Sequence, residues 1–136
     1  MEHGMQMLKT HPQPQSFIAT DQLGSLLSEL ADCAVTCTIC ADACLAEQNV
    51  ARLLRCIRLN QDCADVCQTT ARLLARHTES DINLLRQQLE ACTLACQVCG
   101  EECAKHAERH EHCGICAEAC RHCGQTCQGV LGTVHV

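Results

Sequence analysis

The sequence contains almost no aromatic residues: Phe17 stands alone, and tryptophan and tyrosine are absent. Its hydrophobic core must therefore be built from Leu, Ile, Val, Ala and Cys, which makes a weak core unless another interaction reinforces it. Proline is also scarce, because Pro12 and Pro14 are the only two and both lie near the start. The rest of the chain carries no residue that must break a helix, which favours a helical fold.

Positive charge is limited as well. Ten Lys and Arg residues face sixteen Asp and Glu residues, which gives a formal net charge of −6, and no basic cluster occurs. This composition argues against nucleic-acid binding. No apolar run that we expect to span a bilayer is present, and the first fifteen residues lack the apolar stretch of a secretory signal. We therefore expect a cytoplasmic protein without a membrane or nucleic-acid partner.

Cysteine, in contrast, is abundant, with sixteen among 136 residues. Cytosolic thiols are kept reduced, which favours metal binding over disulfide formation. The residues between the cysteines are mostly Ala, Leu, Glu, Gln and Arg, which form helices and differ from the loop residues of disulfide-rich proteins. Two duller alternatives remain: disulfides that cross between helices, and cysteines that serve only as small apolar core residues.

The spacing of the cysteines weighs against both alternatives. They recur three or four positions apart, which places their side chains along one face of an α-helix. Four such faces can meet only around a shared interior, so the sequence predicts a core lined with sulfur. The sixteen positions are Cys33, Cys37, Cys40, Cys44, Cys56, Cys63, Cys67, Cys92, Cys96, Cys99, Cys103, Cys113, Cys116, Cys120, Cys123 and Cys127.

The pattern predicts a flexible tail over residues 1–15 and a single domain over residues 16–136. Within this domain we expect helices over residues 20–46, 50–76, 81–107 and 111–134. The expected N-caps of the first three helices are Thr20 or Asp21, Asn49 and Ser80.

An internal duplication relates these helices. Residues 23–44 match residues 82–103 at a shift of 59, and residues 53–74 match residues 113–134 at a shift of 60. Two equivalent hairpins with short connections predict an all-α fold, an antiparallel four-helix bundle with a cysteine-lined core. Apolar stripe residues begin the first and third helices and end the other two, so we expect one closed, apolar end.

A sulfur-lined core favours a soft metal ion: Cu(I), Zn(II) or the iron of an iron–sulfur cluster. Zinc would take about four thiolates per ion in closed tetrahedra, and iron–sulfur clusters gather four cysteines around one centre. Cu(I) accepts two or three sulfurs, and each thiolate can bridge two ions. A continuous ladder of thiols therefore favours Cu(I), with a capacity of about one ion per cysteine. An iron–sulfur electron carrier and a zinc-buffering thiol protein remain the alternatives.

The charge balance agrees with Cu(I). Sixteen bare thiolates would take the formal charge from −6 to about −22, which a folded interior cannot tolerate. About sixteen Cu(I) ions would restore the original charge, and binding would release about one proton per ion. No catalysis is expected, because a nucleophilic-cysteine enzyme needs one activated thiolate beside a base rather than many equivalent thiols.

Two histidines and one asparagine complete the candidate metal site. His106 and His110 follow Cys103 at helical spacing, so we expect them at the open end, as the first ligands that incoming ions meet; exposure to solvent is the alternative. His112 lies in the same connection and is a weaker candidate. Asn60 stands where the duplication predicts a cysteine, and it marks either a gap in the ladder or a place where ions pause.

The cysteine stripes and the pair formed by His106 and His110 resemble the bacterial copper storage proteins over about residues 20–134. The missing signal sequence makes the chain look like the cytosolic branch of that family. The resemblance implies a homotetramer of four-helix bundles. It further implies that each bundle stores many Cu(I) ions along its core and is loaded through the end that carries the histidines.

Overall fold

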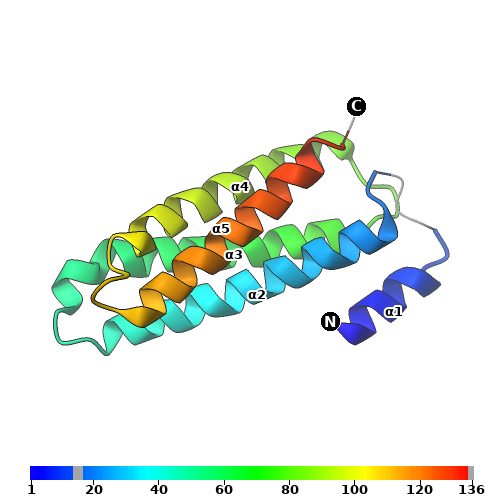
Figure 1. The fold of residues 1–136 in the computed structure, drawn as a ribbon. Helices are drawn as coiled ribbons and strands as arrows, with labels where there is room; N and C mark the ends of the chain where they lie inside the picture. The colour runs from blue at the N-terminus through cyan, green and yellow to red at the C-terminus, as the bar shows by residue number, and fades with distance from the viewer. Residues whose placement is uncertain (14–16, 135–136) are drawn as a thin grey trace.

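The computed structural model describes residues 1–13 and 17–134 of the chain. In this part the regular structure is entirely helical, and four long helices form the bundle that the sequence predicts (Figure 1). A short helix lies outside the bundle, and a 3₁₀ turn leads into its second long helix. The elements are α1 (Glu2–Thr10), α2 (Thr20–Leu45), η1 (Val50–Leu53), α3 (Leu54–Ala75), α4 (Ile82–Ala104) and α5 (Glu111–Leu131).

The four long helices close a ring in which α2 packs on α3, α3 on α4, α4 on α5, and α5 on α2. Figure 1 shows their connections at alternating ends, so neighbouring helices run antiparallel. The sulfur contacts agree: Cys44 at the end of α2 meets Cys113 at the start of α5, and Cys56 at the start of α3 meets Cys103 at the end of α4. We call the end of the bundle where these four cysteines lie the mouth.

The closed end is apolar, as the duplication predicts. Leucine and valine side chains from all four long helices, together with Val134 three residues beyond the end of α5, fill the core there, and each is at most 9% exposed. Leucine and valine offer no metal ligand, so metal chemistry is confined to the sulfur-lined length of the core. These residues are Leu23, Leu26, Leu30, Leu74, Leu85, Leu89, Val130 and Val134.

The predicted helices match the observed ones to within a few residues, but the predicted N-caps are mostly wrong. The N-cap of α2 is Ala19, so Thr20 already lies inside the helix. Asn49 is the N-cap of η1, at the predicted position, but its side chain makes no capping hydrogen bond. Asp81 caps α4 by accepting a hydrogen bond from the backbone N–H of Leu84 at 3.0 Å. Ser80, the predicted cap, instead donates to a backbone carbonyl one turn earlier.

The first residues depart from the expected flexible tail, because residues 2–10 form α1. This helix packs on the start of α2, where Met5 lies directly over Gly24. A Cβ atom at Gly24 would overlap Met5 Sδ, so the missing side chain allows the close approach. Residues 14–16, which include the predicted end of the tail, lie outside the described residues.

Among the described residues, α2 is long and apolar enough to cross a membrane by length and composition alone. The sequence analysis predicted no such segment, because it found no apolar run long enough to span a bilayer. A core helix passes the same test, and half of the apolar segment of α2 is buried inside the bundle. The apolar composition of α2 is thus accounted for by its packing against α3 and α5.

Candidate metal centre

All sixteen cysteines point into the bundle and none forms a disulfide. Fifteen of them are 0% exposed, and Cys40 is 2% exposed. Because residues three or four apart lie on the same face of an α-helix, this spacing directs every thiol of the four helices toward one axis. The predicted sulfur-lined core is confirmed.

Neighbouring sulfurs are close enough to share metal ions. The Sγ–Sγ distance is 3.5 Å between Cys56 and Cys103, 3.6 Å between Cys37 and Cys120, and 4.0 Å between Cys44 and Cys113. Sets of four thiols lie with all sulfurs within 4.8 Å of one another. Adjacent sets share members, so the core is a continuous ladder rather than a row of separate tetrahedral sites. Two such sets are Cys33, Cys63, Cys67 and Cys96, and Cys33, Cys37, Cys63 and Cys120.

Burial keeps two thiols at the mouth, Cys44 and Cys113, protonated in the metal-free protein. It raises the pKa of Cys44 to about 11, and it raises the pKa of Cys113 as well. Loss of a proton would leave a thiolate in an apolar core, which is unfavourable unless a cation arrives with it. The geometry and the charge together fit a core that exchanges protons for soft cations.

Asn60 lies inside the sulfur core and is 0% exposed. Its Oδ1 atom accepts hydrogen bonds from Cys116 at 3.0 Å, Cys99 at 3.1 Å and Cys103 at 3.5 Å, and its Nδ2 atom donates to Cys56 at 3.5 Å. The amide thus joins a set of thiols deeper in the core to the set at the mouth. The structure brings Asn60 together with the cysteines, as predicted.

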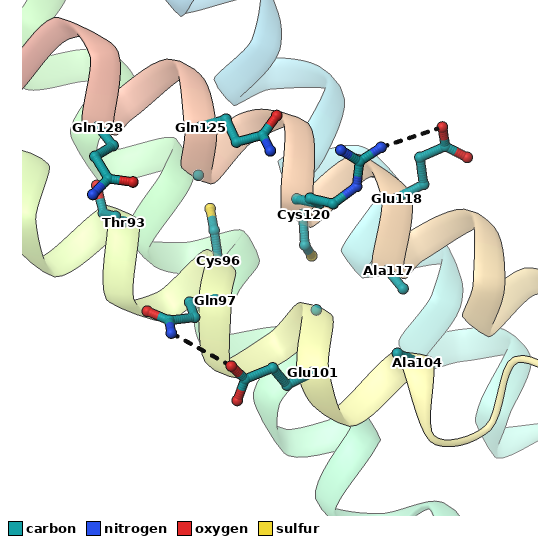
Figure 2. Close-up of a pocket in the computed structure, with 13 residues that line it drawn as sticks. Thr93, Cys96, Gln97, Glu101, Ala104, Ala117, Glu118, Cys120, Gln125 and Gln128 are labelled. Atoms are coloured by element: carbon teal, nitrogen blue, oxygen red, sulfur yellow. Dashed lines mark hydrogen bonds and ion pairs between the residues drawn. The ribbon is translucent and has the colours of Figure 1, made fainter.

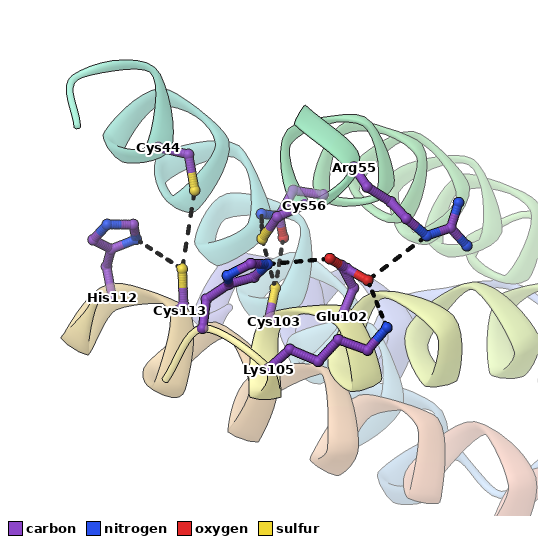
Figure 3. A network of polar contacts seen from close by, with 10 residues as sticks. Cys44, Arg55, Cys56, Glu102, Cys103, Lys105, His112 and Cys113 are labelled. Carbon is purple, nitrogen blue, oxygen red and sulfur yellow. Dashed lines mark hydrogen bonds and ion pairs between the residues drawn. The ribbon is translucent and has the colours of Figure 1, made fainter. Parts of the chain in front are cut away.

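His106 lies at the mouth beside Glu102, and Figure 3 shows Arg55 and Lys105 around the same carboxylate. Its Nε2 atom is 3.1 Å from Glu102 Oε2, and its side chain is 20% exposed, so it is not simply a solvated histidine. Lys105 and Arg55 also pair with Glu102, at 3.2 and 3.7 Å. Burial opposes the charge of Glu102, but hydrogen bonds from His106 and Lys105 outweigh it and hold the pKa of Glu102 below its ordinary value.

His110 and His112 share a different carboxylate at the mouth. Glu47 Oε2 lies 2.9 Å from His110 Nδ1 and 2.9 Å from His112 Nε2. The other ring nitrogen of His112, Nδ1, lies 3.4 Å from Cys40 Sγ and 3.6 Å from Cys113 Sγ. His112 thus reaches the sulfur core more directly than the sequence analysis predicted.

Sequence reasoning missed the two carboxylates. The duplication held a signal for Glu47, because a shift of 59 places Glu47 at the position equivalent to His106. The sequence held no comparable signal for Glu102, which lies one residue before Cys103 and therefore off the cysteine stripe. Its burial and its ion pairs with Arg55 and Lys105 become visible only in the structure.

A groove of about 780 Å³ follows the seam between α4 and α5 (Figure 2). Gly100 and Gly124 allow the two helices to approach closely, because Cβ atoms there would lie 3.2 Å from Cys120 Cβ and 3.3 Å from Cys96 Cβ. Both cysteines contribute to the groove wall but are 0% exposed. The groove therefore does not open the sulfur core.

Comparison with known proteins agrees with this geometry. The family model described as "Copper storage protein" matches residues 19–132. The copper storage protein Ccsp from Streptomyces lividans, in a structure loaded with 10 copper equivalents, is 47% identical with a TM-score of 0.94; the match covers 96% of this chain and 99% of that chain.

Two further relatives match a large part of the chain. A cytosolic copper storage protein from Streptomyces lividans, in a structure with five coppers, is 51% identical with a TM-score of 0.83, and the match covers 85% of this chain and 96% of that chain. A cysteine-rich Bacillus subtilis protein of uncharacterized function, YhjQ, is 34% identical over 99 residues, which is 73% of this chain and 86% of that protein.

Proposed function

The chain belongs to the copper storage protein family, and we propose that it stores many Cu(I) ions in the cytosol on the thiolates of its core. The observation that carries this function is the burial of all sixteen thiols around one axis, with neighbouring sulfurs 3.5–4.0 Å apart. Cu(I) is the soft ion that such a ladder accommodates with bridging thiolates. Neither a zinc-buffering role nor an iron–sulfur role gains support from the family.

The proposed ligands are the core thiols together with the polar residues at the mouth. The cysteines bind and bridge the stored ions at about one ion per thiol. His106 and His110 receive incoming ions, and the contact of His112 with Cys40 and Cys113 adds His112 to this group. Asn60 stands between the mouth sulfurs and the inner sulfurs, where its amide delays ions on their way inward.

Storage needs no chemical step on a substrate, and the family is a family of storage proteins. By family resemblance we propose that the bundle domain over residues 16–136 assembles as a homotetramer. No nucleic-acid or membrane partner is part of the proposal.

An anaerobic titration with Cu(I) against a competing Cu(I) chelator tests the function. We expect the protein to retain many more than four ions per chain, because thiolates in the ladder are shared. A parallel titration with Zn(II) is the control, since closed tetrahedral sites would use about four thiolates for each ion. Saturation with Cu(I) near four ions per chain would contradict storage on a bridged ladder.

A further inference from the structure

The two connections that form the mouth are joined by one carboxylate oxygen. Glu47 lies just after α2, where its backbone N–H donates to the carbonyl of Cys44 at 3.2 Å. His110 and His112 lie at the start of α5 in the other hairpin. Glu47 Oε2 is 2.9 Å from a ring nitrogen of each histidine, and it therefore holds two rings from a distant part of the chain in place.

The two histidines present different nitrogen atoms to Glu47. His110 faces the carboxylate with Nδ1, whereas His112 faces it with Nε2. An ionised carboxylate only accepts hydrogen bonds, so the facing nitrogen of each ring must carry its proton. In the neutral rings the lone pairs are then left on His110 Nε2 and His112 Nδ1. One oxygen thus imposes opposite tautomers on two neighbouring rings.

The lone pairs on His110 Nε2 and His112 Nδ1 both lie at positions where they could bind Cu(I). His112 Nδ1 is 3.4 Å from Cys40 Sγ, in a set of possible ligands that also includes Cys44 and Cys113. His110 Nε2 is buried and has no hydrogen-bond partner among the described residues. A buried nitrogen without a partner is unfavourable, and binding an ion at this position would satisfy it.

We propose that Glu47 is the positioning residue of the mouth: it fixes opposite tautomers in His110 and His112, so that His110 Nε2 and His112 Nδ1 receive incoming Cu(I). Glu47 is not itself a ligand in this arrangement, because carboxylate oxygen suits hard ions and Oε2 is already engaged by both rings. The proposal rests on the copper storage function above. Carboxylates that orient metal-binding histidines act in the same way in other metal sites.

The tautomers can be read directly by NMR. In reduced, metal-free protein labelled with ¹⁵N, long-range ¹H–¹⁵N spectra at about pH 8 distinguish a protonated ring nitrogen from one with a lone pair. We expect His110 to carry its proton on Nδ1 and His112 on Nε2, and Glu47→Ala to abolish the Nδ1–H form of His110. The same tautomer in both rings of the wild type, or an unchanged His110 in the variant, would overturn the proposal.

Loading kinetics test the consequence for copper. Glu47→Ala should slow stopped-flow uptake of Cu(I) by about tenfold. The matched control Glu108→Ala removes an exposed carboxylate from the same mouth connection and should leave the rate unchanged. Glu47→Gln keeps an acceptor oxygen without the charge and should load faster than Glu47→Ala. Equal rates for the Gln and Ala variants would mean that Glu47 acts only by its charge, which contradicts positioning.

The same titrations separate this proposal from the storage function. Equilibrium capacity should be the same in the wild type and in all three variants, because the core thiols are untouched. A low capacity in the wild type would refute storage itself. A high capacity with unchanged tautomers and unchanged rates in Glu47→Ala would refute the role of Glu47 alone.

Discussion

Asn60 shows how one side chain can interrupt a helical stripe that otherwise consists of cysteines. Its Oδ1 atom contacts thiols on both sides of it, Cys99 and Cys116 in one set and Cys103 in the other. An amide oxygen is a poor ligand for Cu(I), which prefers sulfur. The amide therefore interrupts the cysteine stripe of α3 between Cys56 and Cys63.

Replacing Asn60 with cysteine tests the relation between thiols and capacity. Asn60→Cys supplies the thiol that the repeat predicts at this position, since the equivalent position in the second hairpin is Cys120. If each thiol adds one ion, capacity in a chelator titration should rise by about one ion per chain. The control Gln68→Cys adds a thiol on the exposed face of α3 and should add no tightly held ion. Unchanged capacity in Asn60→Cys would contradict a shared ladder that extends past this position.

The histidines at the mouth should affect rates more than capacity. We expect the double variant His106→Phe and His110→Phe to load and unload Cu(I) more slowly in stopped-flow experiments, while it loses at most the ions nearest the mouth. The control His122→Phe changes an exposed histidine on α5, whose side chain is 52% exposed, and should load normally. If loading rates are unchanged in the double variant, or if half of the sites disappear, the role assigned to these residues is wrong.

The sequence predicted which thiols face the core because helical periodicity alone determines that property. It did not predict the partners of the histidines. The contact between Glu47 and His112 joins residues 65 positions apart, and it depends on how two connections pack against each other. Periodicity contains no information about such a contact. The duplication offered the nearest signal, through the equivalence of Glu47 and His106.

The long helices were predictable as elements because a stripe of cysteines and aliphatic residues runs through each of them. Their caps were not, because capping depends on one local hydrogen bond and several residues near each start could supply it. Asp81 rather than Ser80 caps α4 for this reason. Helix α1 was missed because it contains no buried residue and no stripe. Its nine residues are too few to form a stable helix alone, so packing on α2 must support it.

The docking of α1 can be tested at Met5. Met5→Ala removes the side chain that lies over Gly24, so we expect faster hydrogen exchange of the backbone amides of Glu2–Thr10. Exchange in the bundle helices and the capacity for Cu(I) should not change. Met7→Ala is the matched control, because the Met7 side chain is 70% exposed. Equal protection of α1 in the two variants would show that Met5 does not hold it.

The whole molecule combines a core that is weak without metal with a ladder that metal can cross-link. Phe17, which is only partly buried, is the single Phe, Tyr or Trp residue that packs against the core. Leucine and valine side chains fill the closed end of the bundle, and sulfur lines the rest of the core. Ions that bind the folded state stabilise it by mass action. Copper loading should therefore act on the stability of the fold as well as on the stored cargo.

The raised pKa values of Cys44 and Cys113 make the stability of the fold depend on pH in the alkaline range. The pKa of Cys44 rises from an ordinary value of 9.0 to about 11 on folding, so the unfolded chain loses this proton first. Between about pH 9 and about pH 11 the unfolded state binds fewer protons than the folded state, and the stability of the metal-free protein falls as pH rises.

Anaerobic thermal unfolding measures this effect. The melting temperature of the metal-free protein should change little between about pH 8 and about pH 9 and fall above about pH 9. The copper-loaded protein should melt higher and depend little on pH in this alkaline range, since its thiols have already lost their protons. If the metal-free protein melts at the same temperature at about pH 9 and about pH 11, the pH effect assigned to the core thiols is wrong. If it melts at the same temperature as the copper-loaded protein, copper does not stabilise the fold.

Native mass spectrometry of the anaerobically loaded protein tests the central claim most directly, because the mass of each species gives both the ions gained and the protons lost. We predict species that extend toward sixteen Cu(I) ions per chain, with about one proton lost for each ion, since each thiolate is shared between ions. A series that ends near four ions with several protons lost for each would contradict the bridged ladder and indicate separate sites of four thiolates.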